Sequence, residues 1–375
     1  MLPKNLQSKI NERLKENALR SLTVQLPLID FSSNDYLGYA KNTELAQLTH
    51  ELLINQNILQ NGSTGSRLLS GNHKLYKLAE ETLSSHYDAE AALIFNSGYD
   101  ANIGFFSCIP QRGDIILYDE FIHASIRDGI KISLAKGYKF SHNDTVNLKA
   151  LLERHAGSGE IYVVTESVFS MDGDSPDLVR ITEICEQFRA HLIVDEAHAV
   201  GILGKDGKGL VYENDLQKRV FARLVTFGKA LGCHGASILG GEDLKNYLVN
   251  YARSLIYTTA LPPHGIASII IAHEEVLRAK ERNKLVKNIT SFHTLINNRL
   301  TTNLIDSFSA IKSIVIEGNT KVKTIAHKIK EEGYDVKPIL SPTVPRGSER
   351  LRFCLHSYNT QQEISDVLRL LAKFA

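Results

Sequence analysis

The chain has 375 residues, more than a single small core accounts for, so we expect two or three domains. Hydrophobic residues make up 43% and charged residues 23% of the sequence, the composition of an ordinary soluble globular protein. The formal net charge of +1 provides no basic field for nucleic acid or anionic lipid, and no apolar run approaches the roughly 18 residues that span a bilayer.

The N-terminus and the cysteines indicate a cellular compartment. Residues 1–20 lack an apolar signal core and include acidic side chains, which argues against a secretory or transit peptide. The four cysteines lie far apart in the sequence, with no pair at metal-ligand spacing: Cys108, Cys185, Cys233 and Cys354. We therefore expect reduced, mostly buried thiols, a cytoplasmic protein and no metal site.

An amphipathic helix is predicted at the start of the chain. Leu6, Ile10 and Leu14 recur at a spacing of four, with lysines and glutamates between them. This spacing predicts about four turns of helix, ending near Arg20, whose apolar face must lie against another element. A short strand and a polar turn follow in Asp30–Gly38.

A loop rich in glycine and hydroxyl groups follows a helical segment from Thr43 to Gln60. Residues Asn61–Gly71 read NGSTGSRLLSG, and their amides either bind an anion or form a flexible turn. The sequence contains neither a P-loop nor the GxGxxG dinucleotide fingerprint, which weighs against a kinase or a dehydrogenase.

From Leu75 onward, helical and strand-like patterns alternate. The helical segments include Leu75–His86 and Leu178–Arg189, and the apolar strand candidates are Ala91–Phe95, Ile115–Tyr118, Ile161–Thr165, His191–Val194, Leu224–Phe227 and Ser237–Leu239. Such alternation predicts an α/β fold with a mostly parallel sheet and helices on both faces. Ligands of such sheets bind beyond the carboxyl ends of the strands.

The pattern changes after Pro262 and Pro263. A long helical region from Ala267 to Leu300 leads into shorter elements: strand Ile311–Ile316, helix Lys321–Glu331, strand Leu351–Leu355 and helix Gln361–Phe374. We predict an N-terminal helix and crossing segment over residues 1–45, a large domain over 46–285 and a small α+β domain over 286–375.

Lys229 is the first candidate for chemistry. Between Arg223 and Glu242 it is the only residue with a full charge, and it follows a predicted buried strand and a glycine. Desolvation lowers the pKa of a lysine and makes its amine a nucleophile that can form a Schiff base. The alternative is a lysine that reaches water from the end of a strand.

Three more polar residues lie near predicted strand ends. Asp195 closes HLIVD, His198 follows in DEAH, and His123 comes shortly after another strand. Taken singly, such an aspartate is commonly a helix cap and such a histidine a hydrogen-bonded structural residue. Together with Lys229 they form a set that pyridoxal 5′-phosphate (PLP) requires: an amine, a carboxylate for the ring nitrogen and a ring to stack on its face.

A phosphate cup is also predicted. The strand Ala91–Phe95 leads into Asn96–Tyr99, a turn of small residues before a helix, and the amides of such a turn bind phosphate well. The sequence therefore offers each group that PLP needs from a protein.

The chain resembles the α-oxoamine synthases, a branch of the fold type I PLP enzymes, along nearly its whole length. The resemblance rests on SSNDYLG (Ser32–Gly38), GSRLLSG (Gly65–Gly71), SGYDAN (Ser97–Asn102), HAS (His123–Ser125), ESVFSMDGD (Glu166–Asp174), DEAHAVG (Asp195–Gly201), TFGKALG (Thr226–Gly232) and RLRF (Arg350–Phe353). It implies a fold type I transferase, with a mostly parallel central sheet flanked by helices and a smaller α+β C-terminal domain.

The resemblance implies roles for residues that contact the cofactor ring. Lys229 would hold PLP covalently and move protons at the substrate Cα, and Asp195 would pair with the ring nitrogen. His198 and Ser170 would bond the ring oxygen. His123 would stack on the ring and assist acyl transfer.

The resemblance also implies a phosphate site shared between two subunits. The amides of Gly98 and Tyr99 and the hydroxyl of Thr226 would hold the phosphate. The partner subunit's Thr258 and the partner subunit's Thr259 would complete it, which implies a homodimer with its active site at the subunit interface.

The implied substrates are an amino acid and an acyl thioester, joined with loss of CO2. Asn34 and Arg352 would grip the carboxylate of the amino acid, as a guanidinium fork suits. IDFSSNDYLG, IYTTALPP and SPTVP are most similar to the family member that joins L-alanine to a pimeloyl thioester, carried on CoA or acyl-carrier protein, in biotin biosynthesis. In that member the far carboxylate of the chain meets an arginine that matches Arg20.

Two alternatives stay open. Family members that use glycine or serine share the cofactor residues: 2-amino-3-ketobutyrate CoA ligase (glycine C-acetyltransferase), 5-aminolevulinate synthase and serine palmitoyltransferase. A catalytically silent PLP sensor or scaffold is the other. Such proteins usually carry a DNA-binding module or lose the lysine, and neither feature is seen here.

Overall fold

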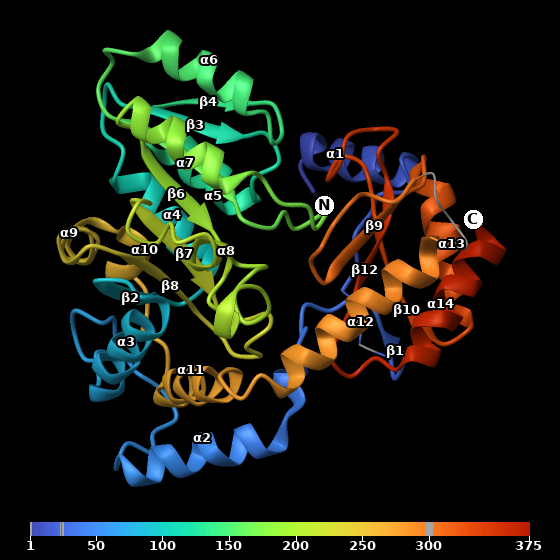
Figure 1. The fold of residues 1–375 in the computed structure, drawn as a ribbon, viewed down its shortest axis with the longest axis horizontal. Helices are drawn as coiled ribbons and strands as arrows, with labels where there is room; N and C mark the ends of the chain where they lie inside the picture. Colours follow the sequence, from blue (N-terminus) through green and yellow to red (C-terminus); the bar gives the residue numbers. More distant parts are fainter. Residues whose placement is uncertain (1, 23, 25, 298–302) are drawn as a thin grey trace. The chain divides into compact units, whose positions relative to one another are not determined.

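The computed structural model describes residues 2–22, 24, 26–297 and 303–375 (Figure 1). Two compact units divide the chain. The larger unit comprises residues 35–170 and 175–283, and the smaller unit comprises residues 1–34, 171–174 and 284–375. The three predicted domain ranges stay a prediction, since these units describe contacts within the chain and not independent folding.

A seven-stranded sheet forms the centre of the larger unit, in the order β2-β8-β7-β6-β5-β3-β4. Its strands are β2 (Ala91–Phe95), β3 (Ile115–Asp119), β4 (Lys136–Phe140), β5 (Ile161–Glu166), β6 (His191–Asp195), β7 (Ala222–Thr226) and β8 (Ala236–Gly240). Strand β8 pairs antiparallel with both of its neighbours, and the other pairs are parallel. The predicted mostly parallel sheet is confirmed.

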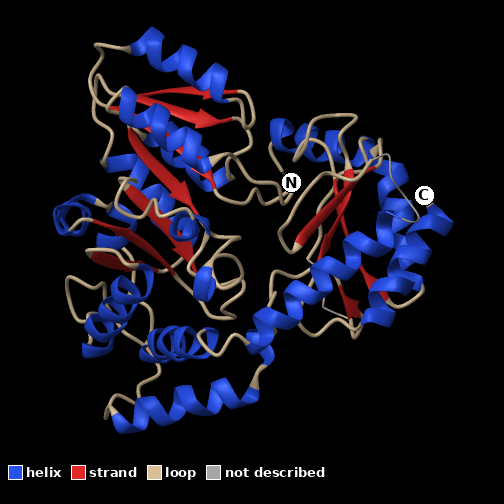
Figure 2. Cartoon of the chain, viewed as in Figure 1, coloured by secondary structure: helices blue, strands red, loops and turns tan. Residues whose placement is uncertain are grey.

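Both faces of this sheet are buried, because successive side chains of a strand point to opposite sides. In β5, Tyr162 and Val164 pack into one apolar cluster, whereas Ile161 and Val163 pack into the other. Helices α4, α5, α9 and α10 contribute to the first cluster, and α6, α7 and α8 to the second (Figures 1 and 2). Continuous apolar runs in the sequence correspond to strands covered on both faces.

The helices of the larger unit are α2 (Thr43–Asn55), α3 (Lys74–Tyr87), α4 (Gly98–Cys108), α5 (Ala124–Ile132), α6 (Thr145–His155), α7 (Leu178–Gln187), α8 (Leu210–Glu213), α9 (Glu242–Tyr251), α10 (Arg253–Ile256) and α11 (Pro263–Val276). Side-chain caps fix several helix starts. Asn42 accepts hydrogen bonds at the start of α2, and Ser97 accepts one from Asp100 at the start of α4.

The smaller unit combines a three-stranded antiparallel sheet, ordered β11-β12-β9, with a parallel pair of short strands, β1 and β10. Its elements are α1 (Lys4–Lys15), β1 (Ile29–Asp30), α12 (Lys280–Asn297, shared with the larger unit), β9 (Ile311–Val315), α13 (Asn319–Glu331), β10 (Tyr334–Asp335), β11 (Lys337–Ile339), β12 (Arg350–Cys354) and α14 (Gln361–Phe374). Helix α13 contacts α14, β11 and β12.

Two predicted helices have wrong limits. Helix α1 ends at Lys15 and not near Arg20, and Asn17 has a positive φ of 51° that a continuing helix does not allow. The region predicted as one helix from Ala267 is two helices, α11 and α12, separated by a turn in which Ala279 has a φ of 57°. The predicted end at Leu300 lies outside the described residues.

Strand β4 was missed because it is an edge strand. Lys136, Gly137 and Lys139 are exposed, and only Phe140 of the five residues is buried. Edge strands commonly carry lysines, which block pairing with another chain. No apolar run therefore marks β4 in the sequence.

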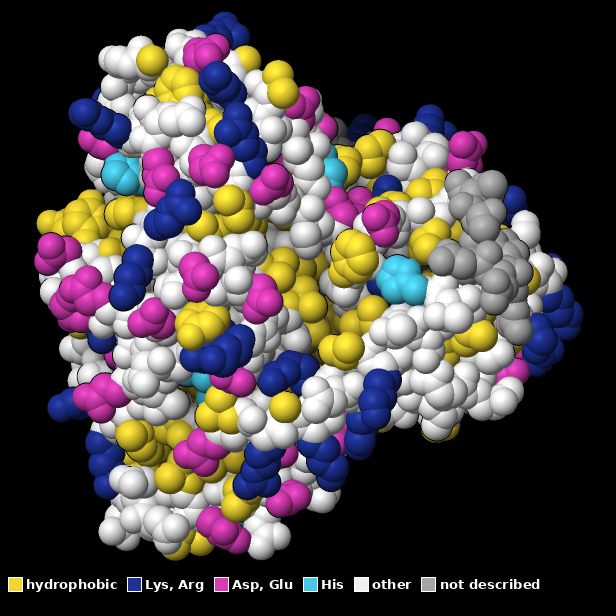
Figure 3. All heavy atoms as spheres, in the orientation of Figure 1, with side chains coloured by type: hydrophobic (Ala, Val, Ile, Leu, Met, Phe, Trp, Pro, Cys, Tyr) yellow, Lys and Arg dark blue, Asp and Glu magenta, His cyan; other side chains and the backbone are white. Residues whose placement is uncertain are grey.

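The surface carries both charges, and Figure 3 shows basic and acidic side chains interspersed over the face that it draws. Among the described helices, none is long and apolar enough to cross a membrane. The four cysteines are free thiols, as predicted; Cys185 and Cys354 are buried, whereas Cys108 and Cys233 are partly exposed.

Candidate active site

The residues predicted to carry out catalysis lie at the edge of the larger unit's sheet where its parallel strands have their carboxyl ends. Glu166 ends β5 and pairs in register with Asp195, which ends β6. Asp195 pairs with Leu224 of β7, two residues before that strand ends at Thr226. Lys229 follows three residues later. Parallel pairing thus places a carboxylate, a hydroxyl and an amine at the edge where such sheets bind ligands.

His198 lies between two hydrogen-bonding groups. Its Nε2 is 2.8 Å from Nζ of Lys229, and its Nδ1 is 2.8 Å from the hydroxyl of Tyr36. His198 is 5% exposed and Tyr36 is fully buried, whereas Lys229 is partly exposed. The Lys229 amine is therefore hydrogen-bonded to His198, whose other ring nitrogen is hydrogen-bonded to Tyr36.

Asp195 and His123 are connected through two side chains. The Asn102 amide group donates to Oδ2 of Asp195 at 3.2 Å and to Oγ of Ser125 at 3.0 Å. The Ser125 hydroxyl is 2.7 Å from Nδ1 of His123. The Ala197 amide donates to the other oxygen of Asp195 at 3.0 Å. Both oxygens of the buried carboxylate thus have donors, as a desolvated charge requires.

The hydrogen bonds of His123 fix its tautomer. The backbone amide of Ser125 donates to Nδ1 of His123 at 3.2 Å, and an amide can only donate. A neutral His123 therefore carries its proton on Nε2. Desolvation lowers the pKa of His123, although the nearby Asp195 carboxylate acts in the opposite direction, so the neutral form is favoured at neutral pH.

Glu166 is a buried acid beside this network. Its Oε1 accepts the backbone amide of His123 at 2.6 Å. Burial raises the pKa of Glu166 to about 8, and the neighbouring Asp195 carboxylate adds to the rise. Glu166 is therefore largely protonated at neutral pH.

A candidate phosphate cup lies at the start of α4. The first amides of a helix have no partner within the helix, and here they belong to Gly98 and Tyr99. The Thr226 hydroxyl is buried with no hydrogen-bond partner. A Cβ on Gly98 would lie 2.7 Å from Cγ2 of Thr226, so the close approach requires glycine.

The residues of this edge fit PLP. An unpartnered hydroxyl beside free helix amides suits a phosphate, a buried carboxylate with two donors suits a cationic ring nitrogen, and an amine held by a histidine suits a covalent link. His123, Asp195, His198 and Lys229, which the sequence singled out, all belong to this arrangement.

Three other predicted cofactor residues lie outside the hydrogen-bond network described above: Ser170, Thr258 and Thr259. Ser170 is partly buried and follows β5 after three buried residues. The Asn96 amide group donates to Oγ1 of Thr258 at 3.2 Å and to the Thr259 carbonyl at 2.7 Å. Both threonines therefore lie beside the turn that begins α4 in their own chain, and their role toward a partner subunit stays a prediction.

The predicted substrate residues lie in the smaller unit. Arg352 of β12 donates to the Asn34 side-chain oxygen at 3.0 Å, and Arg352 is 6% exposed. Arg20 donates to the Thr343 hydroxyl at 3.2 Å. Arg20 and Thr343 line a groove of about 820 Å³ whose apolar lining includes Leu22, Leu26, Leu28 and Ile339.

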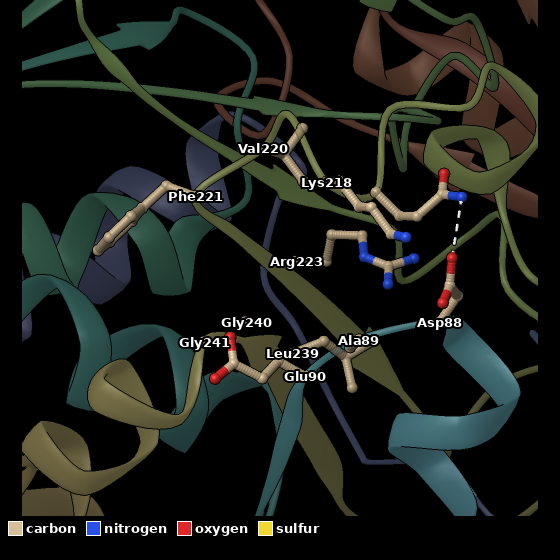
Figure 4. A pocket seen from close by; sticks show the side chains of 11 residues that line it. Asp88, Ala89, Glu90, Lys218, Val220, Phe221, Arg223, Leu239, Gly240 and Gly241 are labelled. Carbon is tan, nitrogen blue, oxygen red and sulfur yellow. Dashed lines mark hydrogen bonds between the residues drawn. The ribbon is translucent and has the colours of Figure 1, made fainter.

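A second cavity lies at the opposite edge of the large sheet (Figure 4). Its volume is about 430 Å³, and it is lined by residues that precede β2 and β7 and by the end of the antiparallel β8. Arg223 and Lys218 face it, and Gln217 donates to Asp88 at 3.2 Å. Asp195 is the last residue of β6, and Lys229 follows the carboxyl end of β7. This cavity, at the opposite edge of the sheet, is therefore separate from the candidate site.

Four residues of the site were not assigned roles from the sequence: Tyr36, Asn102, Ser125 and Glu166. All four lie within the blocks that carry the family resemblance. Glu166 could have been found, since it is a polar residue at the end of a buried strand. Tyr36 and Asn102 depend on contacts between distant segments, which no local pattern indicates.

The sequence of this chain is similar to those of known proteins. Residues 27–371 match the family model described as aminotransferase class I and II. The chain is 39% identical to 8-amino-7-oxononanoate synthase of Emericella nidulans, covering 99% of this chain and 96% of that protein. It is 38% identical to 8-amino-7-oxononanoate synthase of Trichlorobacter lovleyi, covering 92% and 88%.

Solved structures give a similar result. Serine palmitoyltransferase of Sphingomonas wittichii has a TM-score of 0.90 at 26% identity, covering 99% of this chain and 96% of that chain. 8-Amino-7-oxononanoate synthase of Francisella tularensis has a TM-score of 0.77 at 30% identity, covering 92% and 97%. The predicted fold type I architecture is thereby confirmed.

Replacing Thr226 with valine tests the phosphate cup. Valine keeps the shape but removes the hydroxyl, so PLP affinity should fall about tenfold or more, as expected for a lost bond to a charged group. Because that hydroxyl has no partner in the cofactor-free protein, the unfolding midpoint of the cofactor-free T226V variant should not decrease. Thr226→Ser is the control and should retain PLP affinity. Equal PLP affinity in wild type and T226V would exclude this hydroxyl from the cup.

Replacing Glu166 with glutamine tests its protonation. A carboxyl group whose pKa is raised on folding stabilises the native state below its unfolded pKa, and this stability is lost as pH rises through the folded pKa of about 8. Between pH 6.5 and 8.5 the free energy of unfolding of cofactor-free wild type should therefore fall by roughly 1–2 kcal/mol relative to that of E166Q. The exposed Glu153→Gln variant should follow wild type. Parallel pH profiles of wild type and E166Q would show that Glu166 is ionised in the native state.

Proposed function

Because the chain belongs to the aminotransferase class I and II family and, within it, to the 8-amino-7-oxononanoate synthases, we propose that it joins L-alanine to a pimeloyl thioester, releasing CO2 and 8-amino-7-oxononanoate. The chain is a PLP-dependent acyltransferase of the biotin pathway. The observation that carries the proposal is the Lys229–His198 contact beside Asp195, on a chain 39% identical to such a synthase over 99% of its length.

The cofactor and the residues around it would have different roles in the reaction. When bound, PLP supplies an electron sink for negative charge at the Cα atom of the amino acid. We propose that Lys229 anchors PLP covalently, that Asp195 holds the ring nitrogen in its protonated form, and that His198 and Ser170 donate to the ring oxygen. The Nζ atom of Lys229 would then be the base that accepts the Cα proton of the amino acid and later returns one.

His123 is suited to two tasks. Its ring would stack on the cofactor, and its neutral form has a donor at Nε2 because Nδ1 accepts from Ser125. Such a donor can stabilise the charge that develops on the thioester oxygen during acyl transfer. The lowered pKa of His123 supports this role, since a neutral imidazole does not compete with the cationic ring for the Asp195 carboxylate.

The smaller unit is proposed to bind the substrate's charged ends. The Arg352 guanidinium, with Asn34 beside it, suits the carboxylate of L-alanine. Arg20 suits the far carboxylate of the pimeloyl chain, whose methylene groups suit the apolar lining of the groove that includes Leu22 and Leu28. We propose CoA or acyl-carrier protein as the thioester carrier.

The phosphate site is proposed to be shared in a homodimer. Gly98, Tyr99 and Thr226 would bind the phosphate, and the partner subunit's Thr258 and the partner subunit's Thr259 would complete the site. The free amides of α4 and the unpartnered hydroxyl of Thr226 support the part contributed by one chain.

A second candidate is a serine palmitoyltransferase activity. The TM-score of 0.90 over 99% of the chain to the Sphingomonas wittichii enzyme favours it. A palmitoyl chain has no far carboxylate, so it would leave Arg20 without a substrate contact. The two candidates therefore differ in what they require of Arg20.

Thiol release tests the choice of substrates. The PLP-loaded protein is mixed with L-alanine, glycine or L-serine and with pimeloyl-CoA, heptanoyl-CoA, acetyl-CoA or palmitoyl-CoA, and amino-acid-dependent release of CoA is measured. We expect fast release with alanine and pimeloyl-CoA, and at least tenfold slower release with heptanoyl-CoA, which has the same length without the far carboxylate.

In Arg20→Gln this preference for pimeloyl-CoA over heptanoyl-CoA should disappear, whereas Lys218→Gln, at the cavity beside β2 and β7, should retain it. Turnover with serine and palmitoyl-CoA and none with alanine would refute the proposal.

A further inference from the structure

We propose that Ser125 is a positioning residue, which holds the His123 ring in the orientation and the tautomer that the candidate site requires. It acts through two groups, its hydroxyl and its backbone amide, and both contact the Nδ1 atom of His123. The inference rests on the proposed function in one respect, the contact of His123 with PLP, and not on the choice of amino acid or thioester.

The contacts of Ser125 with His123 are local and partly buried. His123 is the N-cap residue of α5, and Ser125 lies in the first turn of that helix. The Ser125 hydroxyl is 2.7 Å from Nδ1 of His123, and the Ser125 amide donates to the same atom at 3.2 Å. Ser125 is 1% exposed, whereas His123 is exposed. Because packing alone does not lock an exposed ring, its orientation depends on these two bonds from a buried residue.

The Asn102 amide group determines the direction of the Ser125 hydroxyl. It donates to Oδ2 of Asp195 at 3.2 Å and to Oγ of Ser125 at 3.0 Å. Since Oγ accepts from Asn102, its own proton can point to Nδ1 of His123. The reverse arrangement would turn the Asn102 carbonyl oxygen toward the Asp195 carboxylate and bring two N–H groups, those of Ser125 and His123, face to face. Ser125 therefore donates twice to Nδ1, and neutral His123 carries its proton on Nε2.

Close packing of two helices brings Asn102 and Ser125 together. Asn102 belongs to α4 and is 3% exposed, and Ser125 belongs to α5. A Cβ on Gly129, one turn after Ser125, would lie 2.9 Å from the Asn102 carbonyl oxygen and 2.8 Å from Cβ of Phe106. Glycine at this position thus allows α5 to approach α4 at the level where Asn102 meets Ser125.

Several charged groups face His123 from other elements. They are Asp195 at the end of β6, Lys229 beyond β7 and Asp128 of α5, and Glu166 at the end of β5 accepts the backbone amide of His123 at 2.6 Å. Desolvation lowers the pKa of His123, Asp195 and Asp128 act to raise it, and Lys229 acts to lower it. Removing the Ser125 hydroxyl removes none of these groups, so a change in the titration of His123 reports the lost bond.

The two bonds have a consequence for both tasks of His123. A ring that is already oriented loses less conformational freedom when it stacks on a cofactor. The hydroxyl donates to Nδ1 only while that atom has no proton, so this bond favours the neutral form of His123 and leaves its N–H at Nε2. Without the hydroxyl, the pKa of His123 should rise and PLP should bind more weakly.

Ring nitrogen shifts of ¹⁵N-labelled histidine test the proposal in the cofactor-free protein, with His123 assigned by comparison with His123→Gln. In wild type the proton of neutral His123 should lie on Nε2, and a proton on Nδ1 would overturn the proposal. In Ser125→Ala the pKa of His123 should rise by about half to one pH unit, the worth of one hydrogen bond. An unchanged pKa would equally contradict the proposal.

Ser237→Ala is the matched control, because Ser237 is 0% exposed and its hydroxyl donates to the Leu93 carbonyl at 3.1 Å. It should leave the pKa of His123 and the PLP affinity unchanged, and equal effects of S125A and S237A would show a general loss of packing instead.

PLP affinity tests whether Ser125 acts through His123. S125A should weaken PLP binding about threefold to tenfold, as expected for one hydrogen bond. In the H123Q background, adding S125A should cause no further loss. A further loss there would overturn the positioning role. Neither the ring nitrogen shifts nor the PLP affinity uses an amino acid or a thioester, so a failure here differs from a failure of the proposed substrates.

Discussion

The parallel pairing of β5, β6 and β7 places Glu166, Asp195 and Thr226 at one edge of a buried sheet, with Lys229 just beyond it. A shift of one residue in this register would move each side chain to the other face of the sheet. The two apolar clusters that cover these faces oppose such a shift, because it would exchange side chains such as Val163 and Val164 between the two clusters and disrupt their close packing. Packing of the sheet thus fixes the geometry on which the chemistry depends.

The same packing buries several carboxyl groups, which differ in their hydrogen-bond partners. Asp195 has donors at both oxygens and suits a permanent charge. Burial raises the pKa of Glu166 to about 8, so this neighbouring carboxyl group is largely protonated at neutral pH. Glu196, the residue after Asp195, accepts the Val211 amide at 2.9 Å. A Cβ on Gly209 would lie 2.5 Å from the Glu196 carboxylate, so this acid also fixes the glycine turn before α8.

Sequence alone predicted the elements that are buried on both sides. Strand β2 was predicted with its observed limits because Ala91–Phe95 is a continuous apolar run, whereas β4 was missed because its lysines face water. The break between α11 and α12 depends on one residue, Ala279, in a conformation that alanine rarely adopts, so periodicity continued through it.

The residues of the candidate site also fall into those that the sequence indicated and those that it did not. Lys229, Asp195, His198 and His123 could be proposed because a single cofactor explains four polar residues near strand ends. Their supporting residues could not, since Tyr36 meets His198 across 162 residues and Asn102 meets Asp195 across 93. Such contacts arise from tertiary packing, which no local pattern encodes.

The central claim is that one amine, that of Lys229, holds the cofactor. Reduction of the PLP-loaded protein with borohydride, followed by peptide mapping, tests it most directly. Lys312 is the natural competitor, because burial lowers the pKa of its amine to about 7. We expect the pyridoxyl label on Lys229 in the peptide that contains TFGKALG. A label on Lys312 or on any other lysine, or no label at all, would contradict the account.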